Sequence, residues 1–85
     1  VSRSATFSQI YEFSLAETDA LSAIFFDKQN AKAYFRLATA CFGLKKYFDS
    51  WRSFGMAAQL DLNNQMYRDM LKATEEMALS QIISQ

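Results

Sequence analysis

The stretch from Ala31 to Asn64 reads AKAYFRLATACFGLKKYFDSWRSFGMAAQLDLNN and contains the clearest structural signal in the chain. Apolar residues recur at helical spacing on both sides of the segment GLKK: Tyr34, Leu37, Ala38 and Cys41 before it, and Tyr47, Trp51, Phe54 and Ala58 after it. GLKK and the segment from 61 to 64 supply breaks in the periodicity. The stretch therefore predicts a helix, a tight turn and an antiparallel second helix.

Part of this pattern returns 34 residues earlier, where EFSLAETDALSAIFFDKQN (12–30) parallels KYFDSWRSFGMAAQLDLNN (46–64). The matched pairs are Phe13 with Tyr47, Ala16 with Ser50, Ala20 with Phe54, Ala23 with Ala57, Asp27 with Asp61, and Asn30 with Asn64. A period of this length is typical of helical-hairpin repeats. The earlier segment therefore predicts a second, less regular hairpin.

The remaining residues, from 65 onwards, form an amphipathic pattern. Met66, Met70, Ala73 and Met77 make one apolar stripe, which is flanked by Tyr67, Leu71, Thr74 and Ala78. The polar positions are charged residues: Arg68, Asp69, Lys72, Glu75 and Glu76. A stack of repeats needs a terminal helix with a polar outer face, and this segment suits that role. We expect five helices in all, at about residues 1–11, 13–26, 31–44, 47–60 and 65–84.

The composition agrees with an all-α domain and indicates which classes of partner and which cellular compartment suit it. There is no proline, and the only glycines are Gly43 and Gly55. Nine basic and nine acidic residues balance, which removes the broad basic surface of a general nucleic-acid binder. The single cysteine, Cys41, excludes an internal disulfide and fits a reducing, cytoplasmic location. Because the chain begins at Val1 and lacks a signal-peptide pattern, we expect an excised segment of a cytoplasmic protein.

Residues that usually carry catalysis are scarce. The absence of histidine removes the commonest general base and metal ligand. Cys41 occupies an inward packing position, which favours a small buried hydrophobe over a nucleophile. Glu75 and Glu76 are adjacent, so their carboxylates diverge around a helix, and no glycine-rich phosphate loop exists. We expect no enzymatic activity, no cofactor and no metal.

Residues 31–64 resemble a tetratricopeptide repeat (TPR). The packing pattern of that family is carried by Tyr34, Leu37, Ala38 and Cys41 in the first helix, and by Tyr47, Ser50, Phe54 and Ala57 in the second. Lys45 replaces the usual turn glycine, and Leu62 replaces the usual proline. The resemblance implies an all-α solenoid of antiparallel helical hairpins, with a concave groove lined by first helices. Its parts would be a partial or degenerate repeat (1–30), a full repeat (31–64) and a C-terminal capping helix (65–85).

The segment KAYFR, Lys32 to Arg36, is similar to the Lys-x-x-x-Arg pair of the "carboxylate clamp" TPR modules of co-chaperones. The resemblance implies a protein–protein interaction module that binds the acidic C-terminal peptide of heat-shock chaperones of the seventy- and ninety-kilodalton classes. Lys32 and Arg36 would hold carboxylates. Phe35, Thr39 and Phe42 share their groove face, although the two aromatic rings could equally pack against a neighbouring helix.

A second motif belongs to the same resemblance. SRSATF, residues 2–7, is similar to the preceding repeat of those modules, with Ser2 in place of an asparagine. Ser2 would assist the clamp, although its hydroxyl donates from a shorter arm than an amide.

A lysine and an arginine one turn apart are also common on solvated surfaces. The alternative is therefore a generic TPR scaffold or self-association module of a larger protein, without chaperone-tail binding. Its contact would be the truncated first helix or the tail segment QIIS (81–84). Neither a nucleic acid nor a membrane is expected as a partner.

Overall fold

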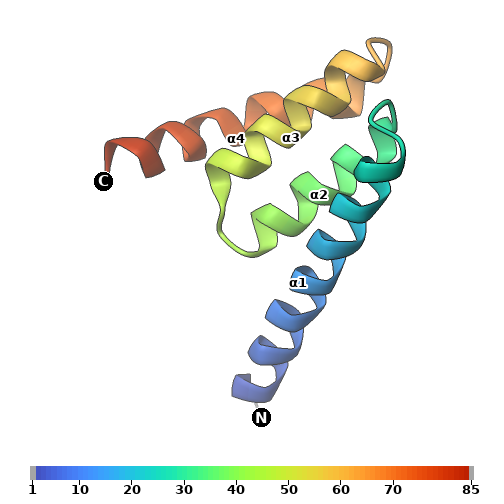
Figure 1. Ribbon diagram of the computed structural model, residues 1–85. Helices are drawn as coiled ribbons and strands as arrows, with labels where there is room; N and C mark the ends of the chain where they lie inside the picture. Colours follow the sequence, from blue (N-terminus) through green and yellow to red (C-terminus); the bar gives the residue numbers. More distant parts are fainter. Residues whose placement is uncertain (1, 85) are drawn as a thin grey trace.

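A computed structural model describes the backbone of residues 2–84 and the side chains of residues 8–84. In these described residues four α-helices follow one another: α1 (Ser2–Phe26), α2 (Ala31–Gly43), α3 (Tyr47–Leu60) and α4 (Gln65–Ile83). The described part of the chain contains no strand, which confirms the all-α prediction. Figure 1 shows α2 and α3 as an antiparallel pair, with α4 running back along α3 and α1 diverging from α2.

Two matched asparagines begin the helices that follow the loops. Asn30 precedes α2 with an extended backbone, and its side-chain oxygen accepts the backbone N–H of Ala33 at 3.1 Å. Asn64 precedes α4 in the same way and accepts the N–H of Tyr67 at 3.2 Å. Such a side chain satisfies a donor that the first helical turn leaves unpaired. These contacts explain why α2 and α4 begin at the predicted residues.

The turn between α2 and α3 depends on Lys45. Its φ of 63° lies in the left-handed region, which most side chains avoid. The turn is closed by the N–H of Lys46, which donates to the carbonyl of Cys41 at 2.8 Å. Lys45 therefore adopts in this turn the backbone conformation that glycine favours.

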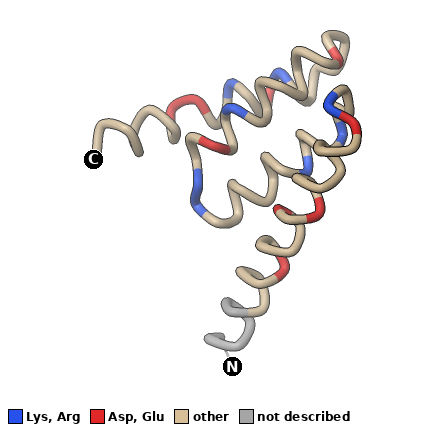
Figure 2. The backbone as a smooth tube through the Cα atoms, in the orientation of Figure 1, with Lys and Arg blue, Asp and Glu red and all other residues tan. Residues whose placement is uncertain are grey.

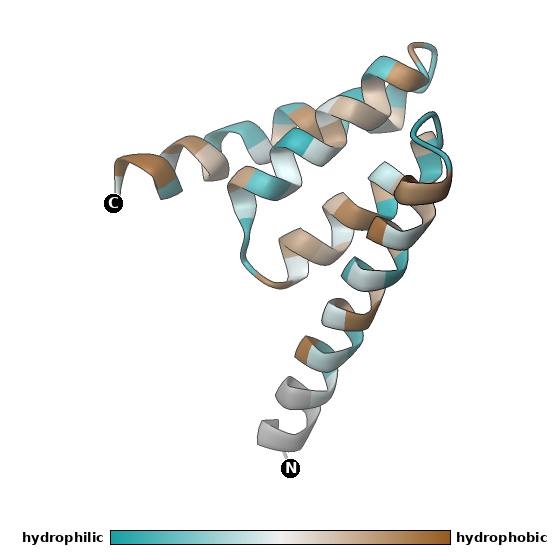
Figure 3. Cartoon of the chain, viewed as in Figure 1, coloured by the Kyte–Doolittle hydropathy of each residue, from teal (hydrophilic) through white to brown (hydrophobic). Residues whose placement is uncertain are grey.

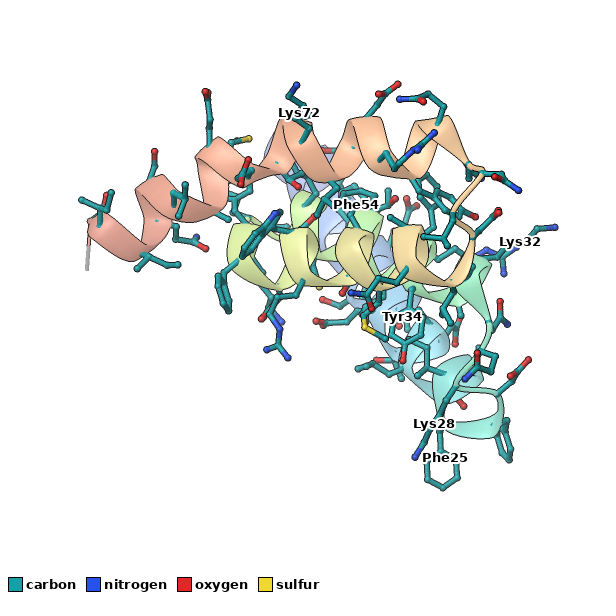
Figure 4. All side chains as sticks on the ribbon, turned by 90° about the horizontal axis from the view of Figure 1, so that it is seen from above. Phe25, Lys28, Lys32, Tyr34, Phe54 and Lys72 are labelled. Atoms are coloured by element: carbon teal, nitrogen blue, oxygen red, sulfur yellow. The ribbon has the colours of Figure 1, made fainter. Side chains whose placement is uncertain are left out.

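The core lies where α2, α3 and α4 meet. Phe54 is fully buried, and its ring lies between the helices in Figure 4. Phe35 of α2 packs edge-on against Phe54 at 5.6 Å and stacks on Tyr67 of α4 at 5.2 Å, measured between ring centroids. The Ser50 hydroxyl donates to the carbonyl of Ala38 at 2.7 Å, so these two small residues hold α3 close to α2.

The N-terminal part of the chain differs from the prediction. We expected two helices, at 1–11 and 13–26, but α1 runs without interruption from Ser2 to Phe26. The predicted break near Glu12 is wrong because no glycine or proline lies there to interrupt the backbone hydrogen bonds. A hairpin turn would also need a left-handed residue, and a bulky tyrosine, Tyr11, occupies the position that corresponds to Lys45. The N-terminal half of α1 consequently projects away from α2 (Figure 1).

Close contact between α1 and α2 persists at Phe13 and Gly43. A methyl group on Gly43 would lie 2.5 Å from the Phe13 ring, so the glycine allows this ring to approach the backbone of α2.

The last turns of α4 carry exposed apolar residues at their far end: Leu79, Ile82 and Ile83 (Figure 3). In the residues that the structure describes, no helix has the length and apolar character needed to cross a membrane.

Candidate functional site

The exposed face of α2 carries three of the predicted site residues. Lys32, Arg36 and Thr39 are all exposed, and their spacing of four and then three residues aligns them along one side of the helix. Figure 4 shows the Lys32 side chain extending away from the helices, and Figure 2 shows basic positions along the backbone of α2. The structure therefore leaves both cations accessible to an anion.

A hollow of about 370 Å³ lies between α1 and α2, beside this face. From α2 it is lined by Phe35, Arg36 and Thr39, with Ala33 and Ala40. From α1 it is lined by Phe13, Ala16, Asp19, Ala20 and Ala23. The structure thus brings three predicted site residues to one hollow, while Lys32 lies one turn before it.

The three uncharged site residues of α2 have different surroundings. The Thr39 hydroxyl donates to the carbonyl of Phe35 at 3.0 Å, so its proton is used within the helix. Phe35 contacts Phe54 and Tyr67 while also lining the hollow, and so belongs to the core and to the site wall. Phe42 is 39% exposed and packs edge-on against Tyr47, with ring centroids 5.4 Å apart, away from the hollow.

The charges around the hollow are mixed. Arg36 borders it from α2, and Asp19 borders it from α1. Asp19 repels an anion that enters the hollow, whereas an anion on the outer side of α2 meets Lys32 and Arg36. The arrangement therefore suits a carboxylate on the outer face and an uncharged group in the hollow.

The α1 half of the hollow was not among the predicted site residues. Its alanines were visible in the sequence, because Ala16, Ala20 and Ala23 correspond by the 34-residue shift to Ser50, Phe54 and Ala57. Ala20 is much smaller than its counterpart Phe54, and this difference in size could have indicated a space beside α1. The side chain of Ser2, the remaining predicted site residue, lies outside the described residues.

Cys41 lies in a separate cluster with Glu17 and Lys46. The Cys41 thiol donates to Glu17 Oε2 at 3.7 Å, and Lys46 Nζ lies 2.9 Å from the same oxygen. Burial, followed by the negative charges of Glu17 and Asp49, raises the pKa of Cys41 to about 11. The thiol is therefore protonated at neutral pH, as expected of a packing residue. The hydrogen bond to Glu17 raises the pKa of Lys46.

A second hollow of about 370 Å³ lies between α1, α2 and α3, and Cys41 and Glu17 of this cluster line it. Among the residues that line it are Leu37 of α2 and Ser53 of α3. No group of three or more acidic, cysteine or histidine residues in the described part of the chain is arranged to hold a metal ion.

Comparisons with protein-family models, with curated proteins and with solved structures found no match to this chain.

Proposed function

We propose that this chain is a TPR-type protein–protein interaction module that binds acidic C-terminal peptides along α2, with Lys32 and Arg36 holding carboxylates. The observation that carries the proposal is the exposed face of α2, where both cations lie one turn apart and Arg36 borders an apolar hollow. A carboxylate at this face gains charge-assisted hydrogen bonds from the guanidinium fork and from the lysine ammonium.

The hollow favours a peptide over a small free anion. Alanine and phenylalanine side chains form most of its wall, and such a wall binds an aliphatic side chain by excluding water. A peptide tail that ends in acidic and aliphatic residues offers both groups, a few ångströms apart. Asp19 would contribute selectivity by repelling a carboxylate from the hollow itself.

The tail of a heat-shock chaperone is the specific ligand that the sequence resemblance supports. KAYFR and SRSATF are the segments that carry this resemblance. The chain has Ser2 in place of the family's asparagine, so we expect weaker binding than an amide at that position would provide.

Fluorescence anisotropy of a labelled peptide ending in Glu-Glu-Val-Asp tests the proposal. Binding should be saturable, weaken as NaCl rises, and fall when the peptide's C-terminal carboxylate is amidated. Lys32→Ala and Arg36→Ala should each raise the dissociation constant about tenfold, as loss of a charge-assisted contact implies. Lys72→Ala, at an exposed lysine of α4, is the matched control and should bind like the wild type.

Two results would contradict the proposal: no saturable binding by the wild type, or equal affinities for the two α2 variants and the Lys72→Ala control. Circular dichroism of each variant should match the wild type, because all three side chains are exposed and their removal leaves the core intact.

A scaffold or self-association module is the second candidate function. Its support is the exposed apolar surface: Phe25, Phe26 and Ile83 are 77%, 83% and 82% exposed. Figure 4 shows the Phe25 ring pointing away from the helices. Side chains of this kind commonly mark contacts with another chain. Sedimentation velocity over a range of concentrations checks this function, and a strict monomer would count against it.

A further inference from the structure

One side of α1 is exposed to solvent and, between residues 8 and 26, carries no charged residue. Its apolar side chains are 48% to 77% exposed: Tyr11, Leu15, Leu21 and Phe25. The hydroxyl residues between them are Ser14, Thr18 and Ser22. At about 100° of rotation per residue, all of these positions fall within an arc of about 120° around the helix. They are called the outer face of α1 below.

The opposite side of α1 packs toward α2. Ala16, Ala20 and Ala23 line the hollow on that side, and Ala20 is buried. These alanines lie about half a turn around the helix from Thr18, which is the middle of the outer face. Figure 1 shows α1 at one end of the row of helices, so the outer face stays open to solvent in a single copy.

The acidic residues of α1 lie beside the outer face rather than on it. At about 100° per residue, Glu17 falls beyond one margin of the face, and Glu12 and Asp19 fall beyond the other. Glu17 is also paired with Lys46, at 2.9 Å. Two outer faces can therefore meet without burying a charge, which is the contact that would most oppose association.

The corresponding side of α3, identified by the internal repeat, is polar. Leu15 of α1 corresponds to Asp49 of α3. Phe25 corresponds to Gln59. Both counterparts are exposed. Two helices in equivalent places thus differ in what they present to solvent, and the apolar character of the outer face is specific to α1. Exposed apolar patches of this kind commonly mark a contact with another chain.

The outer face is symmetric about Thr18 in the kinds of residue that it carries. Equal distances before and after Thr18 hold residues of the same kind: Tyr11 and Phe25, Ser14 and Ser22, Leu15 and Leu21. When two α1 helices lie antiparallel with Thr18 opposite Thr18, each of these pairs comes to one level along the two helices. Aromatic rings then meet at both ends and leucines meet between them. Such a self-complementary arrangement is what a two-fold contact between identical chains requires.

The centre of this arrangement can be dry. The Thr18 hydroxyl donates to the carbonyl of Ser14 at 3.1 Å, so its proton already has a partner within the helix. Burial of Thr18 therefore leaves no unpaired donor. The small side chains of Ser14, Thr18 and Ser22 also let the two helix axes approach closely.

We propose that the outer faces of two copies pair as antiparallel helices about a two-fold axis at Thr18. This dimer rests on the second candidate function, self-association, and gives it a contact surface and a partner. It does not depend on peptide binding by α2, and it leaves the α1–α2 hollow open. Because each copy contributes one helix, the interface is at the small end of specific contacts, and we expect a dissociation constant of about 10–100 μM.

A charge placed on the two-fold axis tests the contact. Thr18→Glu and Thr18→Lys each place like charges opposite one another, so by sedimentation equilibrium each should raise the dimer dissociation constant about tenfold or more. An equimolar mixture of the two variants should form a heterodimer, because opposite charges then meet at the axis. Gln59→Glu adds the same charge as Thr18→Glu at an exposed site of α3, and should dimerise like the wild type.

A disulfide exchange tests the antiparallel orientation. Chains with Tyr11→Cys are mixed with chains with Phe25→Cys, both carrying Cys41→Ala, and are equilibrated in a glutathione buffer. Mass spectrometry should show links between the two kinds of chain in excess of random pairing, because Tyr11 of one copy lies level with Phe25 of the other. Tyr11→Cys mixed with Gln59→Cys is the control and should give only the random distribution.

The possible outcomes separate this dimer from self-association in general. A wild type that stays monomeric at about ten times the expected dissociation constant would overturn both. A dimer that Thr18→Glu leaves intact but Ile83→Glu disrupts would overturn the α1 contact and retain self-association through the end of α4. An excess of links between like chains would overturn the antiparallel orientation. Circular dichroism of the variants should match the wild type, because Thr18, Gln59 and Ile83 are exposed.

Discussion

Gln81, near the end of α4, accepts the backbone N–H of Tyr47, the first residue of α3, at 3.1 Å. The same Oε1 atom accepts the N–H of Phe48 at 3.3 Å, while Nε2 donates to the carbonyl of Lys45 at 2.8 Å. The residue at the N-cap of α3 is Lys46, whose side chain makes no capping hydrogen bond. A side chain 34 residues away in the sequence therefore caps α3 and holds the α2–α3 turn.

Replacement of Gln81 should uncap α3. Gln81→Ala should lower the free energy of unfolding by about 1–2 kcal/mol, because backbone donors at the start of α3 lose their acceptor. Gln81→Glu keeps the acceptor and should recover part of the loss. Urea denaturation followed by circular dichroism measures the change, with Gln59→Ala as an exposed control. Equal losses for Gln81→Ala and Gln59→Ala would show that the cap contributes nothing.

Substitution by alanine should change the stability of the fold in opposite directions at the two glycines, Gly43 and Gly55. Gly43→Ala places a methyl group against the Phe13 ring and should destabilise the fold by about 1–3 kcal/mol, as overpacking does. A methyl group on Gly55 meets only Leu71, at an ordinary 3.5 Å. Gly55→Ala should therefore stabilise the fold by about 0.5–1 kcal/mol, because alanine favours the helix interior.

Thermal unfolding of both glycine variants provides the measurement. A stabilising Gly43→Ala would mean that the Phe13 ring moves aside freely and that the α1–α2 contact is loose at this point.

Lys45 should be a site of stored backbone strain. Lys45→Gly should stabilise the protein by about 1 kcal/mol, because glycine adopts a φ of 63° without steric cost. Lys45→Ala removes the same side chain but keeps a Cβ at this φ, so it gains no such relief and serves as the control. The denaturant midpoint of Lys45→Gly should rise above those of the wild type and of Lys45→Ala, and a destabilising Lys45→Gly would rule out strain at the turn.

Cys41 should react slowly with thiol reagents. Its pKa is raised from 9.0 to about 11, so the thiolate population at pH 8 is about a hundredfold lower than for an ordinary cysteine. The rate of iodoacetamide labelling measures this. Glu17→Gln removes a charge that raises the pKa of Cys41 and should speed the reaction, whereas Glu12→Gln, at an exposed position of α1, should not.

The same shift affects stability at high pH. Because the folded pKa of Cys41 lies above the unfolded value, its contribution to stability is complete below about pH 9 and is lost as the pH rises through 11. Cys41→Ala should therefore unfold with a weaker pH dependence between these values. Identical alkaline transitions for the wild type and Cys41→Ala would contradict the raised pKa.

Local sequence was sufficient to place α2, α3 and α4. Helical periodicity, the Asn30 and Asn64 caps and the break at GLKK are interactions among residues a few positions apart, and the observed bounds agree with the predicted ones within one residue. The alignment of Lys32, Arg36 and Thr39 on one face was predictable for the same reason, since helix geometry alone determines it.

The same local rules explain why the break in α1 was predicted wrongly. The 34-residue match suggested a break near Glu12, but a match in packing positions does not supply a residue that can adopt the turn conformation. The hollow lies beside this continuous α1 helix. The residues of α1 that line it could therefore not be predicted from the helical pattern of α2.

The sequence by itself determined an all-α chain, the three C-terminal helices and the exposed cationic face of α2, because these depend on spacing along one helix. Only the tertiary structure decided that Asp19 and Arg36 border one hollow, that Gln81 caps α3, and that Glu17 lies beside both Cys41 and Lys46. Those contacts join residues on different helices, and the angle at which two helices pack depends on side-chain shape across the interface, which no pattern within a single helix specifies.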